Sequence, residues 1–527
     1  MSKKRQQVLL QILLVVGIIV FINIISVRIF TRLDLTSSKA YSLSDASKKL
    51  VQSLEDNFLV KVYFTAELPA PYNNNRRMLK DQLDDYRAYS KGNFQYEFID
   101  PSANPELEQE AQRYQIPPVQ VQVVKDDKLQ IEKAYMGLVF LYGDKQEHIP
   151  VIQNLDKLEY EISSRLKKLT SHTQYKIGFL TGHGEPSFEQ MKQLQQTLSD
   201  MYELVPVSIA NGQELASDIS ALVIVAPNQS FTETDKYIID QYLMRGGKIA
   251  FFINQIDASL QKQTGQALSL NIEDLIESYG VRINADMVRD ARCANVTIQQ
   301  QSGFMTFQSQ VPFPYLPIGS EFNPNSVIVK NLGPVIFHFV SSIDTSFAKA
   351  KGLNATVLLS SSNKAGRMQG MFLINPTMPF TADMFTEQFI PLAVSVEGSF
   401  KSLFAGKNVS LDSLAKHAID QTKKLTSSVQ TKIVVVGDGD FIQDTYAGTK
   451  DNMVFANNLI DWLVDDIGLA SIRTKELAVK PLDEVSDGTR TFVKSLNLVV
   501  PPLIIVLIGI VRWRLRVSRR KRIEMSI

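Results

Sequence analysis

Residues 178–188 read GFLTGHGEPSF and place His183 and Glu185 two positions apart, with a glycine on each side of the histidine. An imidazole beside a carboxylate is a common arrangement in general acid–base catalysis and in metal binding. The stretch begins at the end of an apolar run typical of a strand and leads into a predicted helix. In open α/β sheets, ligands bind beyond the carboxyl ends of the strands, so a functional loop is expected at such a position.

A second glycine-framed stretch, GDGDF at residues 437–441, follows another buried apolar run and contains Asp438 and Asp440. If the two strands are neighbours in one sheet, these aspartates converge with His183 and Glu185 on a single crevice. These four residues are therefore the candidates to line a crevice that binds a ligand or a partner.

The sequence lacks residues that hydrolysis and metal binding would require. A hydrolase requires a nucleophile, but Ser187 has no G-x-S-x-G context and Cys293, the only cysteine, lies far downstream. The stretch GDGDFIQD lacks the spacing of a calcium loop, and the other histidines form no H-x-H or H-E-x-x-H pair. We expect no catalytic residue, no metal site and no cofactor.

The remaining interpretation of these stretches is structural. The glycines allow tight turns, while Glu185 and the aspartates cap helix N-termini, and a ligand or partner contact would add to these roles. The chain contains no ATPase motif, because neither GGKIAFF nor AGTKD has the G-x-x-x-x-G-K-[ST] spacing.

Two apolar runs suggest membrane anchors. The 527-residue chain has 56 Lys+Arg and 55 Asp+Glu, and this balance argues against a nucleic-acid-binding protein. Residues 8–27 are almost wholly apolar and, at about 1.5 Å per residue, span a hydrocarbon core of about 30 Å. The run is too long for a signal peptide and lacks a small-residue cleavage site, which favours an uncleaved anchor. Residues 498–511 form a shorter run, which Trp513 and snorkelling arginines extend.

A dense basic block follows the second run and consists of Arg512, Arg514, Arg516, Arg519, Arg520, Lys521 and Arg522. By the positive-inside rule this tail is cytoplasmic, and the basic residues before the first run place the N-terminus on the same side. We therefore predict a two-pass protein of the bacterial inner membrane whose bulk is periplasmic. Because orientation needs fewer charges, the block is also expected to contact anionic lipid, with a protein partner as the alternative.

The exported part is predicted to hold two α/β domains. Residues 40–170 give the order β-α-β-α-β-β-α, which resembles a thioredoxin-like fold without its C-x-x-C pair. Residues 175–470 alternate buried strands with helices, which predicts a doubly wound domain, amidotransferase-like but non-catalytic, with an insertion at about 256–430. The other predicted segments are a cytoplasmic N-terminus at 1–7, the first span at 8–27, a linker at 471–495, the second span at 496–513 and the tail at 514–527.

Several stretches stand between the two anchors in an order similar to that of the GldG family, the auxiliary components of ABC transporters associated with gliding motility. They are RLDLTSSKAYSLSDASKKLVQSLEDNFLVKVYFTAELP, YEFIDP, GFLTGHGEP, ALVIVAPNQSFTETDKYIIDQYLMRGGKIAFFINQID and VVVGDGDFI. The resemblance implies a non-enzymatic, membrane-tethered accessory subunit that acts beside a separate permease and a cytoplasmic ATPase. It carries over no catalytic residue. A periplasmic ligand-binding receptor and an amidotransferase-like hydrolase remain the alternatives.

Overall fold

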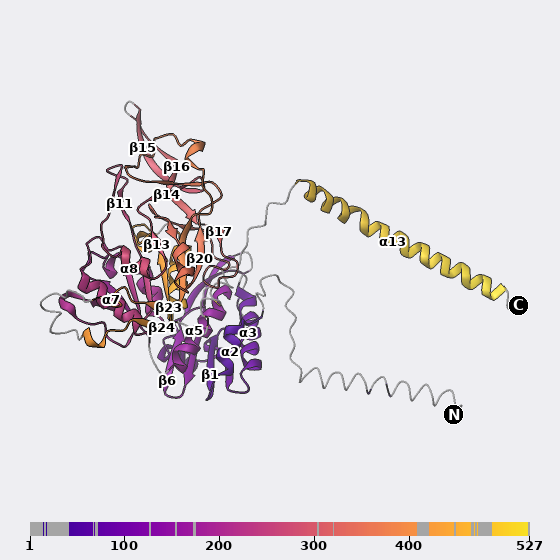
Figure 1. The fold of residues 1–527 in the computed structure, drawn as a ribbon. Helices are drawn as coiled ribbons and strands as arrows, with labels where there is room; N and C mark the ends of the chain where they lie inside the picture. The colour runs from indigo at the N-terminus through magenta and orange to yellow at the C-terminus, as the bar shows by residue number, and fades with distance from the viewer. Residues whose placement is uncertain are drawn as a thin grey trace. The chain divides into compact units, whose positions relative to one another are not determined.

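The computed structural model describes residues 14, 17, 42–66, 68, 72–125, 128–152, 155–171, 175–302, 305–319, 321–407, 421–446, 449–464, 468, 472 and 487–524 (Figure 1). The chain divides into two compact units, Met1–Ala478 and Val479–Ile527. The expected first span at residues 8–27 lies outside the described residues, apart from Leu14 and Gly17. The mixed α/β architecture predicted from the sequence is confirmed.

The N-terminal part of the larger unit is built on a four-stranded sheet in the order β2-β1-β5-β6. Strand β1 is parallel to β2 and antiparallel to β5, which is in turn antiparallel to β6. The elements are α2 (Asp45–Gln52), β1 (Phe58–Phe64), α3 (Asn75–Tyr89), β2 (Phe94–Ile99), α4 (Pro105–Arg113), β5 (Met136–Tyr142), β6 (Lys145–Ile149) and α5 (Leu158–Thr170). One core joins the sheet to its helices and includes Phe58, Leu83 and Ile162.

A hairpin interrupts this order where the sequence predicted a third strand of the sheet. Strand β3 (Val119–Lys125) pairs antiparallel with β4 (Lys128–Ala134) in a separate two-stranded sheet. The four strands expected from the sequence correspond to β1, β2, β3 and β5, so β3 was expected but lies outside the main sheet, while β4 and β6 were not predicted. The physical reason is the pattern of apolar residues. Strand β3 alternates valine with glutamine and so has only one apolar face, whereas the central strand β5 is buried over five successive residues.

A larger sheet of eight strands follows, in the order β17-β20-β23-β24-β10-β9-β7-β8. The last five strands of this order are mutually parallel, whereas β23 and β20 are antiparallel to their neighbours. The strands are β7 (Lys176–Thr181), β8 (Glu203–Ser208), β9 (Ile219–Val225), β10 (Ile249–Phe252), β17 (Glu321–Phe322), β20 (Asn354–Ser360), β23 (Pro391–Lys401) and β24 (Ser427–Val436). Because both faces are covered, β9 and β10 are almost continuously buried, as their apolar runs predict.

Helices cover both faces of this sheet. On one face α6 (Lys192–Ser199) and α11 (Lys450–Val464) pack into a core that includes Leu194 and Phe455. On the other face α7 (Glu233–Met244) and α8 (Glu273–Ser278) pack into a second core that includes Ile239 and Leu275. The eleven residues of α7 after Glu233 are all buried.

The segment predicted as an insertion contributes strands β17, β20 and β23 to the main sheet. It also forms several small sheets. Its remaining elements are β11 (Ile256–Ser259), β12 (Thr264–Ala267), β13 (Arg282–Ile283), β14 (Met287–Asp290), β15 (Cys293–Ser302), β16 (Met305–Gly319), β18 (Val335–Ile336), β19 (Ile343–Asp344), α9 (Ser346–Ala350), β21 (Ala365–Met368) and β22 (Phe372–Leu373). The small sheets are β11-β12-β22, β13-β19, β14-β21 and β15-β16-β18. The segment is therefore partly an extension of the main sheet and partly a separate set of hairpins.

The second unit contains one long helix, α13 (Asp487–Glu524). It begins earlier than the predicted span at residues 496–513, so residues 487–495 are helical where a linker was predicted. Pro501 and Pro502 lie inside the helix and not in its first turn. In the described part of the chain one helix, Gly488–Val517, is long and apolar enough to cross a membrane by length and composition. Its 30 residues correspond to about 45 Å, more than the hydrocarbon core requires.

Candidate functional site

The site begins at the carboxyl edge of the main sheet, where neighbouring parallel strands end. Strand β7 stands beside β9, and their helices α6 and α7 cover opposite faces of the sheet. A point at which successive connections leave on opposite faces is the usual ligand-binding crevice of such sheets. The stretch with His183 and Glu185 follows β7 and therefore stands at this point.

The backbone of this loop is fixed against the loop that follows β9. The carbonyl of His183 accepts hydrogen bonds from the amides of Asn228 and Gln229, both at 2.9 Å. Gly184 has φ +79°, and a Cβ there would lie 1.9 Å from the side-chain oxygen of Asn228. The glycine is required by both its backbone conformation and this close approach.

The side chain of His183 is buried between two carboxylates. Its Nε2 lies 3.2 Å from Oδ2 of Asp235, and its Nδ1 lies 3.4 Å from Oε1 of Glu185. The ring stacks on Phe231 with centroids 3.9 Å apart. Burial lowers the pKa of His183, but the contacts with Asp235 and Glu185 outweigh burial and raise it to about 9. At neutral pH the imidazole is therefore charged and cannot accept a proton as a general base.

Both carboxylates also bind backbone amides. Asp235 and Thr232 form the capping box of α7, with the Asp235 carboxylate accepting the amide of Thr232 at 2.8 Å. Burial raises the pKa of Asp235, but the bonds from His183 and Thr232 outweigh it and lower the pKa. Glu185 accepts the amide of His183 at 2.7 Å. The prediction that Glu185 caps a helix is wrong, because its carboxylate closes its own turn.

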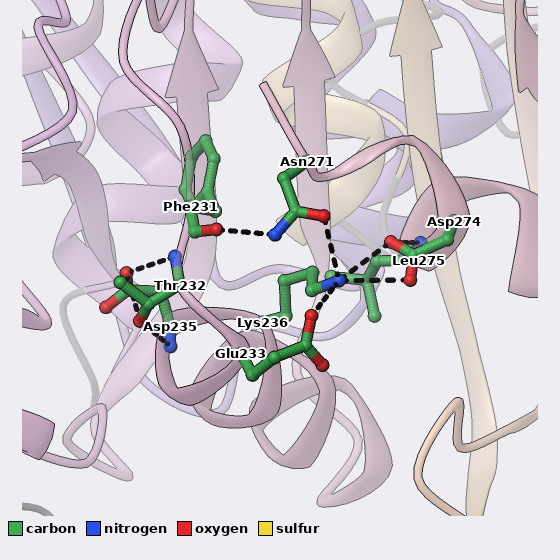
Figure 2. Close-up of polar contacts among 8 residues, drawn as sticks. All are labelled: Phe231, Thr232, Glu233, Asp235, Lys236, Asn271, Asp274 and Leu275. Carbon is green, nitrogen blue, oxygen red and sulfur yellow. Dashed lines mark hydrogen bonds and ion pairs between the residues drawn. The ribbon is translucent and has the colours of Figure 1, made fainter. Parts of the chain in front are cut away.

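Figure 2 shows how the first turn of α7 is held against the first turn of α8 and the residue Asn271 before it. Lys236 is 1% exposed, and its ammonium contacts Glu233 and Asp274, with 3.0 Å to Oδ2 of Asp274. Asn271 accepts from the same ammonium at 3.4 Å and donates to the carbonyl of Phe231 at 2.8 Å. This network fixes the residue on which His183 stacks.

The GDGDF stretch after β24 forms a second cluster. The carboxylate of Asp438 accepts the amides of His338 and Asp440, both at 2.7 Å. Asp440 accepts from the side chain of Gln443 at 2.7 Å. Burial raises the pKa of Asp438 well above its usual range and raises that of Asp440 to about 6. Burial also lowers the pKa of His338 to about 4, so this imidazole is neutral at pH 7.

The pair His183 and Glu185 and the pair Asp438 and Asp440 do not meet in one crevice, which would require their strands to be neighbours. Strands β9 and β10 stand between β7 and β24, so the strands that carry the two stretches are not neighbours. Each stretch instead contacts the loop after β9, since His183 binds Asn228 and a Cβ on Gly439 would lie 2.6 Å from the amide nitrogen of Ala226. The expected single crevice is therefore replaced by two clusters on either side of that loop.

Asp235, Phe231 and Lys236 were not predicted as site residues from the sequence. The sequence does signal Asp235 as part of the T-x-x-D capping box at the start of α7. A capping box needs no histidine, so this motif alone does not predict the contact with His183. Asp444, the last residue of the GDGDFIQD stretch, accepts the amides of Lys192 and Gln193 at the start of α6. Within the described residues no group of three or more His, Cys, Asp or Glu has an arrangement that could hold a metal ion.

The described part of the basic tail lies in α13. Arg512, Arg514 and Arg516 are exposed, and the helical backbone continues past Arg519, Arg520, Lys521 and Arg522 to Glu524.

Comparison with known proteins identifies the family. A model for auxiliary components, described as "ABC-type uncharacterized transport system", matches residues 174–465, which is more than half of the chain. The chain belongs to this family. The match covers the eight-stranded sheet with both candidate clusters. A second family model, "Domain of unknown function (DUF7088)", matches residues 37–141, the region of β1 to β5.

Individual proteins add distant similarities. An uncharacterized protein of Borreliella burgdorferi is 23% identical over 527 residues, covering 97% of this chain and 99% of its own length. The mmIFT52 N-terminal domain is 16% identical with a TM-score of 0.33, covering 55% of this chain and 97% of that domain. PurLQS from Thermotoga maritima is 8% identical with a TM-score of 0.24, covering 55% of this chain and 100% of that chain. Both TM-scores are below the level of a shared fold.

His183→Gln tests the buried imidazolium. A group whose pKa is raised on folding stabilises the folded state fully below its unfolded pKa of about 6.5 and loses this contribution as the pH rises through the folded pKa. We therefore expect a stabilisation on the order of 2 kcal/mol that fades between about pH 6.5 and 9. The thermal midpoint of the variant, measured on the full chain in detergent, should be lower at pH 6.5 and flatter across this window.

His148→Gln is the matched control, because it makes the same change in β6. This control should keep the pH profile of the wild type. A His183→Gln profile that coincides with the wild type would contradict the ion-paired imidazolium.

Proposed function

We propose that the protein is a non-enzymatic accessory subunit of an ABC transporter of the GldG type, whose exported body acts with a separate permease and a cytoplasmic ATPase. The observation that carries this proposal is the match of residues 174–465 to the transport-system family. The anchor expected at residues 8–27 and the apolar helix α13 would tether the body to the membrane at both ends.

The geometry of the sheet edge favours a scaffold over an enzyme. Where a doubly wound sheet would bind its ligand, both ring nitrogens of His183 face carboxylates and its carbonyl binds two amides. Two hydroxyls lie near His183 in sequence: Ser187 belongs to a capping box with Gln190, and Thr181 donates to the carbonyl of Val207 at 3.2 Å. The His183 carbonyl, the His183–Asp235 contact and the Ser187 capping box hold loops together, which supports a role in positioning a partner over one in bond cleavage.

The N-terminal region fits the same role. Its sheet order β2-β1-β5-β6 has the one parallel and two antiparallel pairings of a thioredoxin-like fold, and we propose that assignment. The stretch after β1 has no cysteine, so this region would serve as a binding module and not as a thiol oxidoreductase.

We also propose a two-pass topology with the body outside the cytoplasm and the basic tail inside. The tail would contact anionic lipid, which attracts each basic residue with about 1 kcal/mol near the surface. A helical backbone that continues through the block to Glu524 would carry these charges beyond the apolar part of α13 and towards a cytoplasmic partner.

Purification of the tagged full chain from its own membranes in mild detergent tests the function. We expect a permease and an ATPase to be recovered in stoichiometric amounts, with an unrelated two-anchor protein as the control. A lone protein with a bound small molecule would support a receptor, and a turnover lost in His183→Ala would support a hydrolase; either result contradicts the accessory role.

A variant with four tail residues changed to glutamine, Arg516, Arg519, Arg520 and Arg522, separates lipid contact from docking. It retains three basic residues to hold the topology. If the tail docks a partner, recovery of the ATPase at moderate salt should fall. Unchanged recovery would leave the tail with lipid contact alone.

Single cysteines test the topology in spheroplasts. Cys293→Ser removes the native thiol, and a cysteine is then placed either at Gln369, which is exposed, or at Ser526 in the tail. A membrane-impermeant maleimide should label position 369 in intact spheroplasts and position 526 only after permeabilisation. Labelling of position 369 only after permeabilisation would place the body in the cytoplasm.

A further inference from the structure

The hairpin of β15 and β16 carries no charge. From Cys293 to Ser320 the chain contains no Asp, Glu, Lys, Arg or His, although 21% of its residues are charged overall. The two strands pair from Cys293↔Pro317 to Ser302↔Met305, and the hairpin stands at one end of the ribbon of its unit (Figure 1). Solvent-facing edge strands usually carry charged side chains, whereas the centres of protein interfaces are depleted of charged residues.

The outer edge of β15 is open. Strand β15 stands at the end of the sheet β15-β16-β18, and among the described residues no other strand pairs with it. An open edge presents a row of N–H and C=O groups that proteins protect with proline, lysine or bulges. Strand β16 has three prolines at 312, 314 and 317, whereas β15 has none, and its register is irregular only between Cys293 and Asn295.

The strand is held in place from one side. Val296 is buried in a small core with Phe313 and Tyr315, while Asn295 and Thr297 on the opposite face are exposed. Alternation along the strand therefore anchors one face and leaves the other, together with the edge, available for contact.

Exposed apolar side chains accompany the same small core. Phe372 and Ile374 belong to it, and the residues next to them, Met371 and Leu373, are 77% and 46% exposed. Phe307 on β16 is 50% exposed. Exposed apolar side chains beside a small shared core are common at protein contact surfaces.

We propose that the edge of β15 pairs antiparallel with the same edge of a second copy of this chain, so that the two hairpin sheets join into one. A two-fold contact brings identical surfaces together, and any charge near the axis would face its own copy. The missing charge removes this repulsion. A strand from a strongly acidic or basic partner would gain nothing from a neutral edge, so the composition favours self-pairing.

Charge placed on the exposed face of β15 tests the pairing. The triple variant Asn295→Lys, Thr297→Lys, Gln299→Lys puts like charges on both sides of the two-fold axis. The wild-type full chain in detergent should have twice the mass of one chain, measured by sedimentation equilibrium at micromolar concentration. The lysine variant should have half that mass. An equimolar mixture with the matching triple glutamate variant should regain the doubled mass, because opposite charges then face each other.

The control carries lysines at Gln308 and Gln310 of β16, which pair with Gln299 and Thr297 but lie one strand further from the axis. It should keep the doubled mass. A monomeric wild type, a lysine variant that stays dimeric, a control that dissociates equally, or a mixture that stays monomeric would each overturn the proposal. Because only correctly folded edges can pair in the mixture, its recovery also excludes misfolding of the variants. The result is independent of whether a permease is recovered.

Discussion

A charged imidazole between two buried carboxylates ties together the segments that meet at the carboxyl edge of the main sheet. His183 comes from the loop after β7, while Asp235 belongs to the first turn of α7. Phe231, which stacks on the imidazole, is held by Asn271 in front of α8. If the imidazole were neutral, two carboxylates would be buried with one counter-charge fewer, which is costly inside a protein. The ion pair therefore joins the loop after β7 to the first turn of α7, whose later residues are held by the core.

This arrangement changes what the sheet edge can do. At the carboxyl ends of β7 and β9 the amides of Asn228 and Gln229 bind the carbonyl of His183, and Gly184 allows the two loops to touch. On the other side of the β9 loop, Asp438 and Asp440 bind amides and a glutamine, and burial favours their protonated forms. The family match covers this whole edge of the sheet.

The sequence predicted those parts of the fold that depend on local pattern. The apolar runs of β9, β10 and β24 and the cap at Thr232 follow from periodicity and from capping chemistry. The order of the strands in the sheet does not, because it is set by long-range packing, and the expected meeting of His183 with Asp438 failed for that reason. Likewise Asp235 was visible as a cap but not as the partner of a histidine 52 positions earlier. The start of α13 was placed too late because its first turns are polar, and apolarity was the only signal used.

The charge state of His183 can be measured directly. Selective isotope labelling of the five histidines, with His183→Gln to assign one signal, allows the imidazole to be titrated by NMR in the folded full chain. The ion pair predicts an imidazolium at pH 7.5 that releases its proton only at about pH 9. A signal that titrates at or below the ordinary histidine value of about 6.5 would contradict it, because the loop after β7 would then be held without the ion pair.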